Sequence, residues 1–121
     1  MNMSKVLVIG ITIAGVVLVS NDAFAHAKLV ASSPAANAAV AQPELITLTF
    51  DEPLVAAFSS FDLTMSDGMK IPVKITISDD MKTLTGTPQD KVVPGEYIVI
   101  WHAAAQDDGH RMDGTLSFVA D

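Results

Sequence analysis

The chain contains no cysteine, and aromatic residues make up only 6% of its 121 residues. The absence of cysteine excludes disulfide bonds, so the fold must rely on its hydrophobic core. Basic residues are also few, because seven Lys and Arg stand against 14 Asp and Glu, and the net charge is −7. This charge argues against nucleic acid or an anionic membrane surface as a partner, since both require a basic surface.

The first 25 residues have the features of a secretory signal peptide. Lys5 provides a positive charge near the amino terminus, and residues 6–20 contain no charged residue. The sequence Ala-Phe-Ala at residues 23–25 matches the small-residue pattern of signal peptidase sites. A membrane anchor is the alternative, but a spanning helix requires about 20 apolar residues, which is more than this run contains. We therefore expect residues 1–25 to be removed as a signal peptide.

The mature chain is then expected to cover residues 26–121 as one exported domain that is not embedded in a membrane. Its apolar residues alternate with polar ones in short runs, which is typical of β-strands, and turn-forming residues separate the runs. This pattern predicts an all-β fold, a small antiparallel immunoglobulin-like β-sandwich of about seven strands. The expected strands lie within residues 26–32, 43–50, 59–66, 70–78, 81–87, 96–102 and 114–121, and residues 33–42 are expected to form a loop with a short helical turn.

Cleavage after residue 25 would make His26 the first residue of the mature chain. An amino-terminal histidine offers two nitrogen donors, its α-amine and its imidazole Nδ1, which together close a chelate ring around a metal ion. Asp108 and His110, two residues apart in an expected loop, offer a carboxylate oxygen and a second imidazole. Two imidazoles, an amine and a carboxylate favour Cu(II), although Zn(II) also accepts such donors.

Each part of this metal site also has a simpler interpretation. A histidine after a cleavage site can be accidental, and Asp-Asp-Gly-His at residues 107–110 is typical of a hairpin turn. Asp107 can replace Asp108 as the ligand. The site also requires the first strand to run beside the hairpin expected within residues 96–120.

Methionines and one further histidine are additional candidates. The thioethers of Met65, Met69, Met81 and Met112 are soft donors that suit Cu(I). Met65, however, lies on the apolar face of its expected strand and Met69 follows a turn, so we expect packing or incidental exposure rather than a Cu(I) site. His102 ends the expected central strand, and we interpret it as an ordinary half-exposed residue of the sheet.

Two stretches of the chain resemble the CopC copper-resistance proteins. The sequence His-Ala-Lys-Leu-Val at residues 26–30, followed by Ile-Thr-Leu-Thr-Phe-Asp-Glu-Pro-Leu at residues 46–54, is similar to the start of that family. Residues 94–120, which contain Tyr-Ile-Val-Ile-Trp and Asp-Gly-His, are similar to its final hairpin.

The resemblance implies a periplasmic β-sandwich that holds Cu(II) through His26, Asp108 and His110. Two features depart from the family pattern. The methionine-rich segment that many relatives carry is reduced to Met-Ser-Asp-Gly-Met at residues 65–69, without its histidine. His102 stands where relatives usually have arginine, so the resemblance assigns it no role.

We therefore expect a monomeric copper carrier or buffer rather than an enzyme, and the resemblance implies exchange of copper with a CopD-like membrane transporter. One alternative is a copper polysaccharide monooxygenase, which also begins with histidine. The low aromatic content and a full set of four protein donors argue against that enzyme. The other alternative is an adhesion or assembly module in which the histidines bind no metal.

Overall fold

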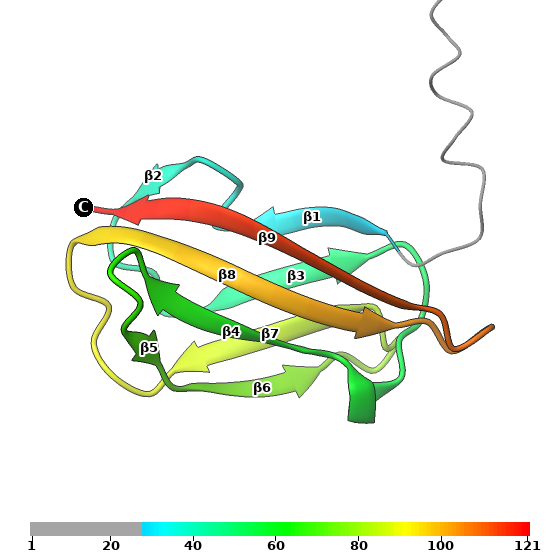
Figure 1. The fold of residues 1–121 in the computed structure, drawn as a ribbon. Coiled ribbons are helices and arrows are strands. Elements are labelled where there is room, and N and C mark those ends of the chain that lie inside the picture. Colours follow the sequence, from blue (N-terminus) through cyan, green and yellow to red (C-terminus); the bar gives the residue numbers. More distant parts are fainter. Residues whose placement is uncertain (1–27) are drawn as a thin grey trace, which may run out of the picture.

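Two β-sheets packed face to face form the protein (Figure 1). The computed structural model describes residues 28–121, so the expected signal peptide and His26 lie outside the described residues. One sheet has four strands in the order β1-β3-β7-β6, and the other has five strands in the order β2-β9-β8-β4-β5.

Strands make up most of the described residues. They are β1 (Leu29–Ser33), β2 (Ala39–Val40), β3 (Ile46–Phe50), β4 (Ser60–Met65), β5 (Lys70–Ile71), β6 (Val73–Ile77), β7 (Thr83–Pro88), β8 (Gly95–Ala104) and β9 (Arg111–Ala120). A short 3-10 helix, η3 (Ala56–Phe58), precedes β4. Within residues 28–121, no helix has the length and apolar character needed to cross a membrane.

All seven strands expected from the sequence are present, and the β-sandwich is confirmed. The segment 33–42, however, holds a short strand, β2, which pairs in parallel with β9. Backbone hydrogen bonds to β9 explain the position of this segment. The Asn37 N–H donates to the Ser117 carbonyl at 2.7 Å, and the Val119 N–H donates to the Ala38 carbonyl at 2.8 Å. These bonds hold the segment against β9, and the expectation of a helical turn there is wrong.

The core lies between the two sheets. Six side chains from both sheets contribute to it, four of them buried and two partly buried and packed against the others. They are Phe50, Phe61, Trp101 and Phe118, and then Val73 and Ile75. The Trp101 indole meets the Phe50 ring edge to face, with centroids 5.2 Å apart. Strand β8 lies between β9 and β4, as expected for a central strand.

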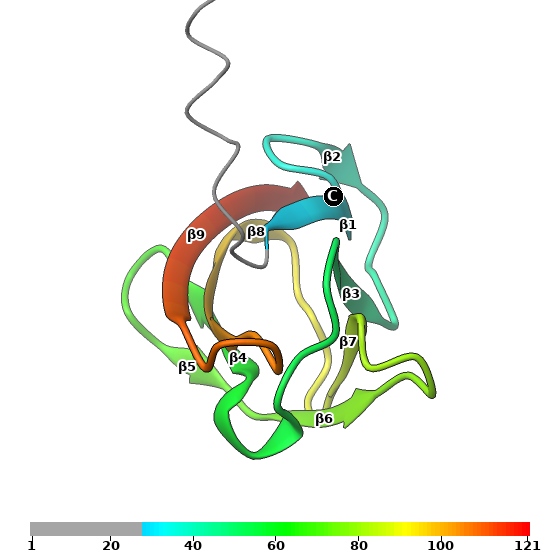
Figure 2. The same cartoon turned by 90° about the vertical axis from the view of Figure 1, so that its right-hand side faces the viewer.

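The position of β1 bears on the metal hypothesis. β1 belongs to the four-stranded sheet, where it pairs with β3. Figures 1 and 2 both draw it beside β9, at the edge where the two sheets meet. The first strand therefore runs beside the β8–β9 hairpin, as the hypothesis requires, but it is hydrogen-bonded into the opposite sheet.

Candidate metal centre

The loop between β8 and β9, residues 105–110, lies at one end of the sandwich (Figure 2). The Gly109 N–H donates to the Ala105 carbonyl at 2.9 Å, and the Ala105 N–H donates to the His110 carbonyl at 3.1 Å. Gly109 has a φ of 70°, a left-handed conformation that glycine adopts at low cost. The turn expected from the Asp-Gly pair is thus confirmed.

A local hydrogen bond joins Asp108 to His110. The His110 backbone N–H donates to Asp108 Oδ1 at 2.9 Å. Such a bond, typical of Asp in turns, fixes the carboxyl group relative to the loop backbone. Both residues are exposed, and so is Asp107, whose side chain makes no hydrogen bond within residues 28–121. Of the two neighbouring carboxylates, Asp108 is therefore the one that the loop orders.

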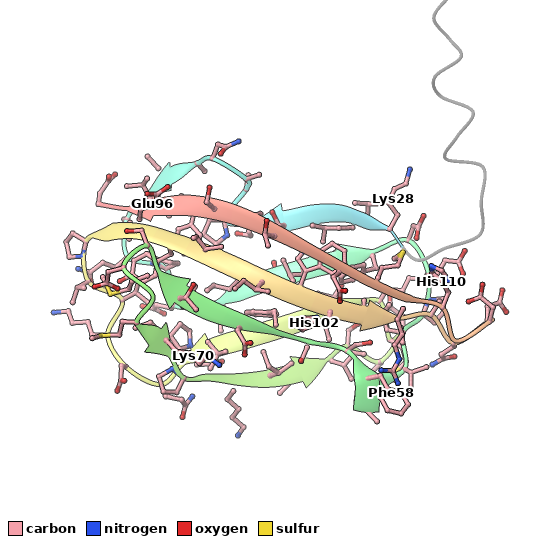
Figure 3. All side chains as sticks on the ribbon, in the orientation of Figure 1. Lys28, Phe58, Lys70, Glu96, His102 and His110 are labelled. Atoms are coloured by element: carbon pink, nitrogen blue, oxygen red, sulfur yellow. The ribbon has the colours of Figure 1, made fainter. Side chains whose placement is uncertain are left out.

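The described chain begins at the same end of the sandwich. The Lys28 N–H donates to Asp51 Oδ1 at 2.8 Å, and the Asp51 N–H donates back to the Lys28 carbonyl at 3.0 Å. Figure 3 shows Lys28 and His110 at this same end of the sandwich. The start of β1 and the β8–β9 loop therefore share one end of the molecule.

Residues 51–55 link these two regions, because the segment that begins with Asp51 also contacts the loop. The Gln106 N–H donates to the Pro53 carbonyl at 3.0 Å, and the Gln106 side-chain amide donates to the Leu54 carbonyl at 3.0 Å. Leu54 also pairs with Ala105 in an antiparallel bridge. One short segment is thus bound both to the chain start and to the loop.

The structure brings two of the three expected ligands together, Asp108 and His110. His26, the third, lies outside the described residues. Among residues 28–121 there is no group of three or more His, Cys, Asp or Glu side chains that could hold a metal ion. Asp108 and His110 supply two of the four donors that the expected Cu(II) centre requires. The other two belong to His26, so this centre remains a prediction.

His102 has a partner that the sequence did not reveal. Its Nδ1 lies 2.7 Å from Asp113 Oδ1, across the β8–β9 pair in which the two residues are in register. The His102 and Asp113 side chains are 51% and 75% exposed, so the interpretation of His102 as a partly exposed sheet residue is confirmed. The pairing depends on strand register, which alternation alone does not define.

A second contact beside the loop was also missed. The Arg111 guanidinium lies over the ring of Phe58, 4.5 Å from its centroid, in a cation–π arrangement. Phe58 belongs to η3 and is 54% exposed, and Figure 3 shows it at the same end as His110. The contact gives an exposed aromatic residue a partner and draws the Arg111 side chain toward η3.

The methionines of the reduced family segment lie away from this end. Met65 is partly buried and packs against the core, while Met69 is 60% exposed. Both flank the β4–β5 turn, where the Met65 N–H donates to the Met69 carbonyl at 2.8 Å, at the opposite end of the sandwich from the loop (Figure 1). Packing for Met65 and exposure for Met69 agree with the expectation from sequence.

Comparison with known proteins assigns the family. Residues 29–121 match the family model described as the CopC domain. The chain belongs to the CopC family. It is 39% identical over 108 residues to copper resistance protein C of Xanthomonas campestris pv. juglandis, which covers 84% of each chain. It is 34% identical over 125 residues to copper resistance protein C of Escherichia coli, which covers 96% of this chain and 95% of that protein.

Solved structures of the family agree with the fold. The crystal structure of PcoC, described as a methionine-rich copper resistance protein from Escherichia coli, matches with a TM-score of 0.74 and 34% identity over 80% of this chain and 100% of that one. The structure of CopC from Methylosinus trichosporium OB3b matches with a TM-score of 0.71 and 30% identity over 79% and 94% of the two chains. The resemblance predicted from sequence is confirmed, and family membership connects this chain with copper.

Proposed function

We propose that the mature protein binds Cu(II) in the periplasm and carries or buffers it, without catalysing a reaction. The observation that best supports this function is the ordered Asp108–His110 turn at the end of the sandwich where the described chain begins. Family membership supports copper as the ion, because the relatives are named for copper resistance. Copper is then the cargo of the protein.

The proposed ligands are the α-amine and imidazole of His26, an oxygen of Asp108 and the imidazole of His110. His26 precedes Lys28 by two residues, and two residues of chain reach at most about 7 Å. Because the Lys28 backbone is bound to Asp51 at this end, its position limits how far from the loop the amine can lie. Nitrogen donors with one carboxylate suit Cu(II) in a tetragonal arrangement.

Removal of residues 1–25 is part of the proposal, because the α-amine of His26 exists only after cleavage. The same step would release the protein as a soluble monomer outside the cytoplasm. A CopD-like membrane transporter is the proposed partner for copper exchange. Four protein donors would fill the four equatorial positions of tetragonal Cu(II) and leave none of them for oxygen, which favours a carrier over an oxygen-activating enzyme.

The mass of the protein purified from the periplasm tests the first part of this proposal. We expect a chain that begins at His26 and gains the mass of one Cu(II) per molecule. A chain that begins elsewhere, or one that retains no Cu(II) after dialysis, would contradict the proposal.

His110→Ala tests the second part. We expect it to weaken Cu(II) binding in a competition titration more than Asp108→Ala does, because water or Asp107 can replace an oxygen donor. His102→Ala is the matched control, since it removes another exposed imidazole of the same hairpin and should leave the affinity unchanged. Full Cu(II) affinity in His110→Ala would show that the proposed site is wrong.

A further inference from the structure

We propose that Asp51 is a positioning residue of the copper site. Its carboxylate holds the backbone at Lys28, and its own segment is bound to the loop that carries His110. Asp51 would therefore set the spacing between the amino-terminal donors and the loop donors. This inference rests on the proposed function and deepens it, because Asp51 is not one of the proposed ligands.

The Asp51 side chain binds the backbone directly beyond the last residue pair of the β1–β3 ladder. The last residue pair of that ladder is Leu29 with Phe50, and the register shifts between Leu29 and Ala31. Such an irregularity bends a strand, so the direction of the chain before Leu29 depends on further contacts. Lys28 supplies two, because its N–H donates to Asp51 Oδ1 at 2.8 Å and its carbonyl accepts the Asp51 N–H at 3.0 Å.

The other side of Asp51 is bound to the body of the protein. Leu54 is fully buried, and its N–H donates to the Met81 carbonyl at 2.8 Å. The carbonyls of Pro53 and Leu54 accept the two hydrogen bonds from Gln106. A shift of this segment relative to the loop would break these bonds and expose a buried leucine. Asp51 therefore binds Lys28 from a segment, residues 51–55, whose position relative to the loop is fixed by hydrogen bonds.

Three variants separate this role from its alternatives. Asp51→Ala removes the acceptor of the Lys28 N–H. Asp51→Asn keeps a carbonyl oxygen at the same place but removes the charge, so it preserves a positioning bond and would abolish a carboxylate ligand. Asp67→Ala is the matched control, because Asp67 Oδ1 accepts the Met69 N–H at 2.9 Å in an exposed bond of the same kind at the opposite end of the sandwich.

The first measurement is amide hydrogen exchange in the metal-free mature protein. We expect the Lys28 amide to lose protection in Asp51→Ala and to keep it in Asp51→Asn and Asp67→Ala. The second measurement is Cu(II) affinity together with the electron spin resonance spectrum of the bound ion. We expect Asp51→Ala to weaken binding roughly tenfold, which corresponds to about 1.4 kcal/mol, and to change the spectrum. Asp51→Asn and Asp67→Ala should resemble the unsubstituted protein in both respects.

Each contrary outcome has a distinct meaning. Equal loss of affinity in Asp51→Asn and Asp51→Ala would show that the charge acts rather than the hydrogen bond, and would overturn the positioning role. An unchanged affinity and spectrum in Asp51→Ala, while His110→Ala still binds weakly, would overturn this inference and leave the proposed function standing. Absence of Cu(II) binding by the unsubstituted mature protein would overturn both.

Discussion

Replacing Gly114 by alanine tests how the β8–β9 hairpin accommodates the only tryptophan of the chain. Gly114 lies in register with Trp101 on the neighbouring strand. A Cβ at Gly114 would overlap the indole, lying 2.8 Å from its Nε1 and closer still to two ring carbons. The indole has little room to withdraw, because it is buried and packs against the Phe50 ring with a centroid separation of 5.2 Å.

Overpacking of this kind costs typically 1–3 kcal/mol. We therefore expect Gly114→Ala to lower the free energy of unfolding by about 2 kcal/mol. In a domain of this size, that loss lowers the melting temperature by roughly 8–16 °C. Thermal unfolding followed by circular dichroism measures the change. Thr115→Ala, an exposed position on the same strand, is the control and should change the melting temperature much less.

A double-mutant cycle isolates the steric cause. Trp101→Phe removes the ring atoms that the new methyl group would meet, so the cost of Gly114→Ala should be smaller in that background. An unchanged melting temperature in Gly114→Ala, or the same cost with Trp101 and with Phe at position 101, would refute the steric reasoning.

Three further predictions concern residues outside the proposed ligand set. His102→Ala should lower stability by at most about 1 kcal/mol, because the pair with Asp113 is exposed, and a large drop in thermal unfolding measurements would contradict this. Replacing Met65 and Met69 by leucine should leave Cu(I) binding unchanged in a competition titration, and a clear loss with folding intact would reveal a Cu(I) site. Burial raises the pKa of Tyr97, whose hydroxyl donates to the Val93 carbonyl at 2.6 Å, above its ordinary 10.0. Because the unfolded phenol ionises near pH 10 while the folded one keeps its proton, stability should fall as the pH rises through 10, and Tyr97→Phe should remove this part of the fall in urea unfolding.

Much of the fold could be predicted because its determinants are local. Period-two alternation located β3, β4, β6 and β9, and the apolar run of residues 96–102 placed β8 in the middle of its sheet. The Asp-Gly pair predicted the loop that carries Asp108 and His110, since a left-handed glycine is a property of the turn itself. Core membership followed from the same alternation, which assigns each side chain to one face of its strand.

What was missed depends on contacts between segments far apart in the sequence. The parallel pairing of β2 with β9 comes from hydrogen bonds of Asn37 and Ala38, in a stretch with no strand-like alternation. The His102–Asp113 pair requires the register of two strands. The anchoring of Lys28 by Asp51 joins residues 23 positions apart. Spacing along the chain contains none of this information, so the contact between Asp51 and Lys28 was accessible only from the structure.

The two halves of the proposed copper site come from different sheets, and this gives metal binding a consequence for stability. The chain that leads to His26 continues into β1 of the four-stranded sheet, whereas Asp108 and His110 belong to the β8–β9 hairpin of the five-stranded sheet. A Cu(II) ion held by both would join the sheets at this end and would bind the folded chain more tightly than the unfolded chain, in which only the His26 donors stay together. Such binding stabilises the folded state by at most about 2.7 kcal/mol when the free ion is at 100 times its dissociation constant. We expect a clear rise in melting temperature with Cu(II) for the chain that begins at His26, and a smaller one for a chain that begins at Ala25, whose His26 nitrogen is an amide. Equal stabilisation of the two chains would show that the α-amine is not a ligand. The proposed link between the two sheets through the amine of the chain terminus would then be wrong.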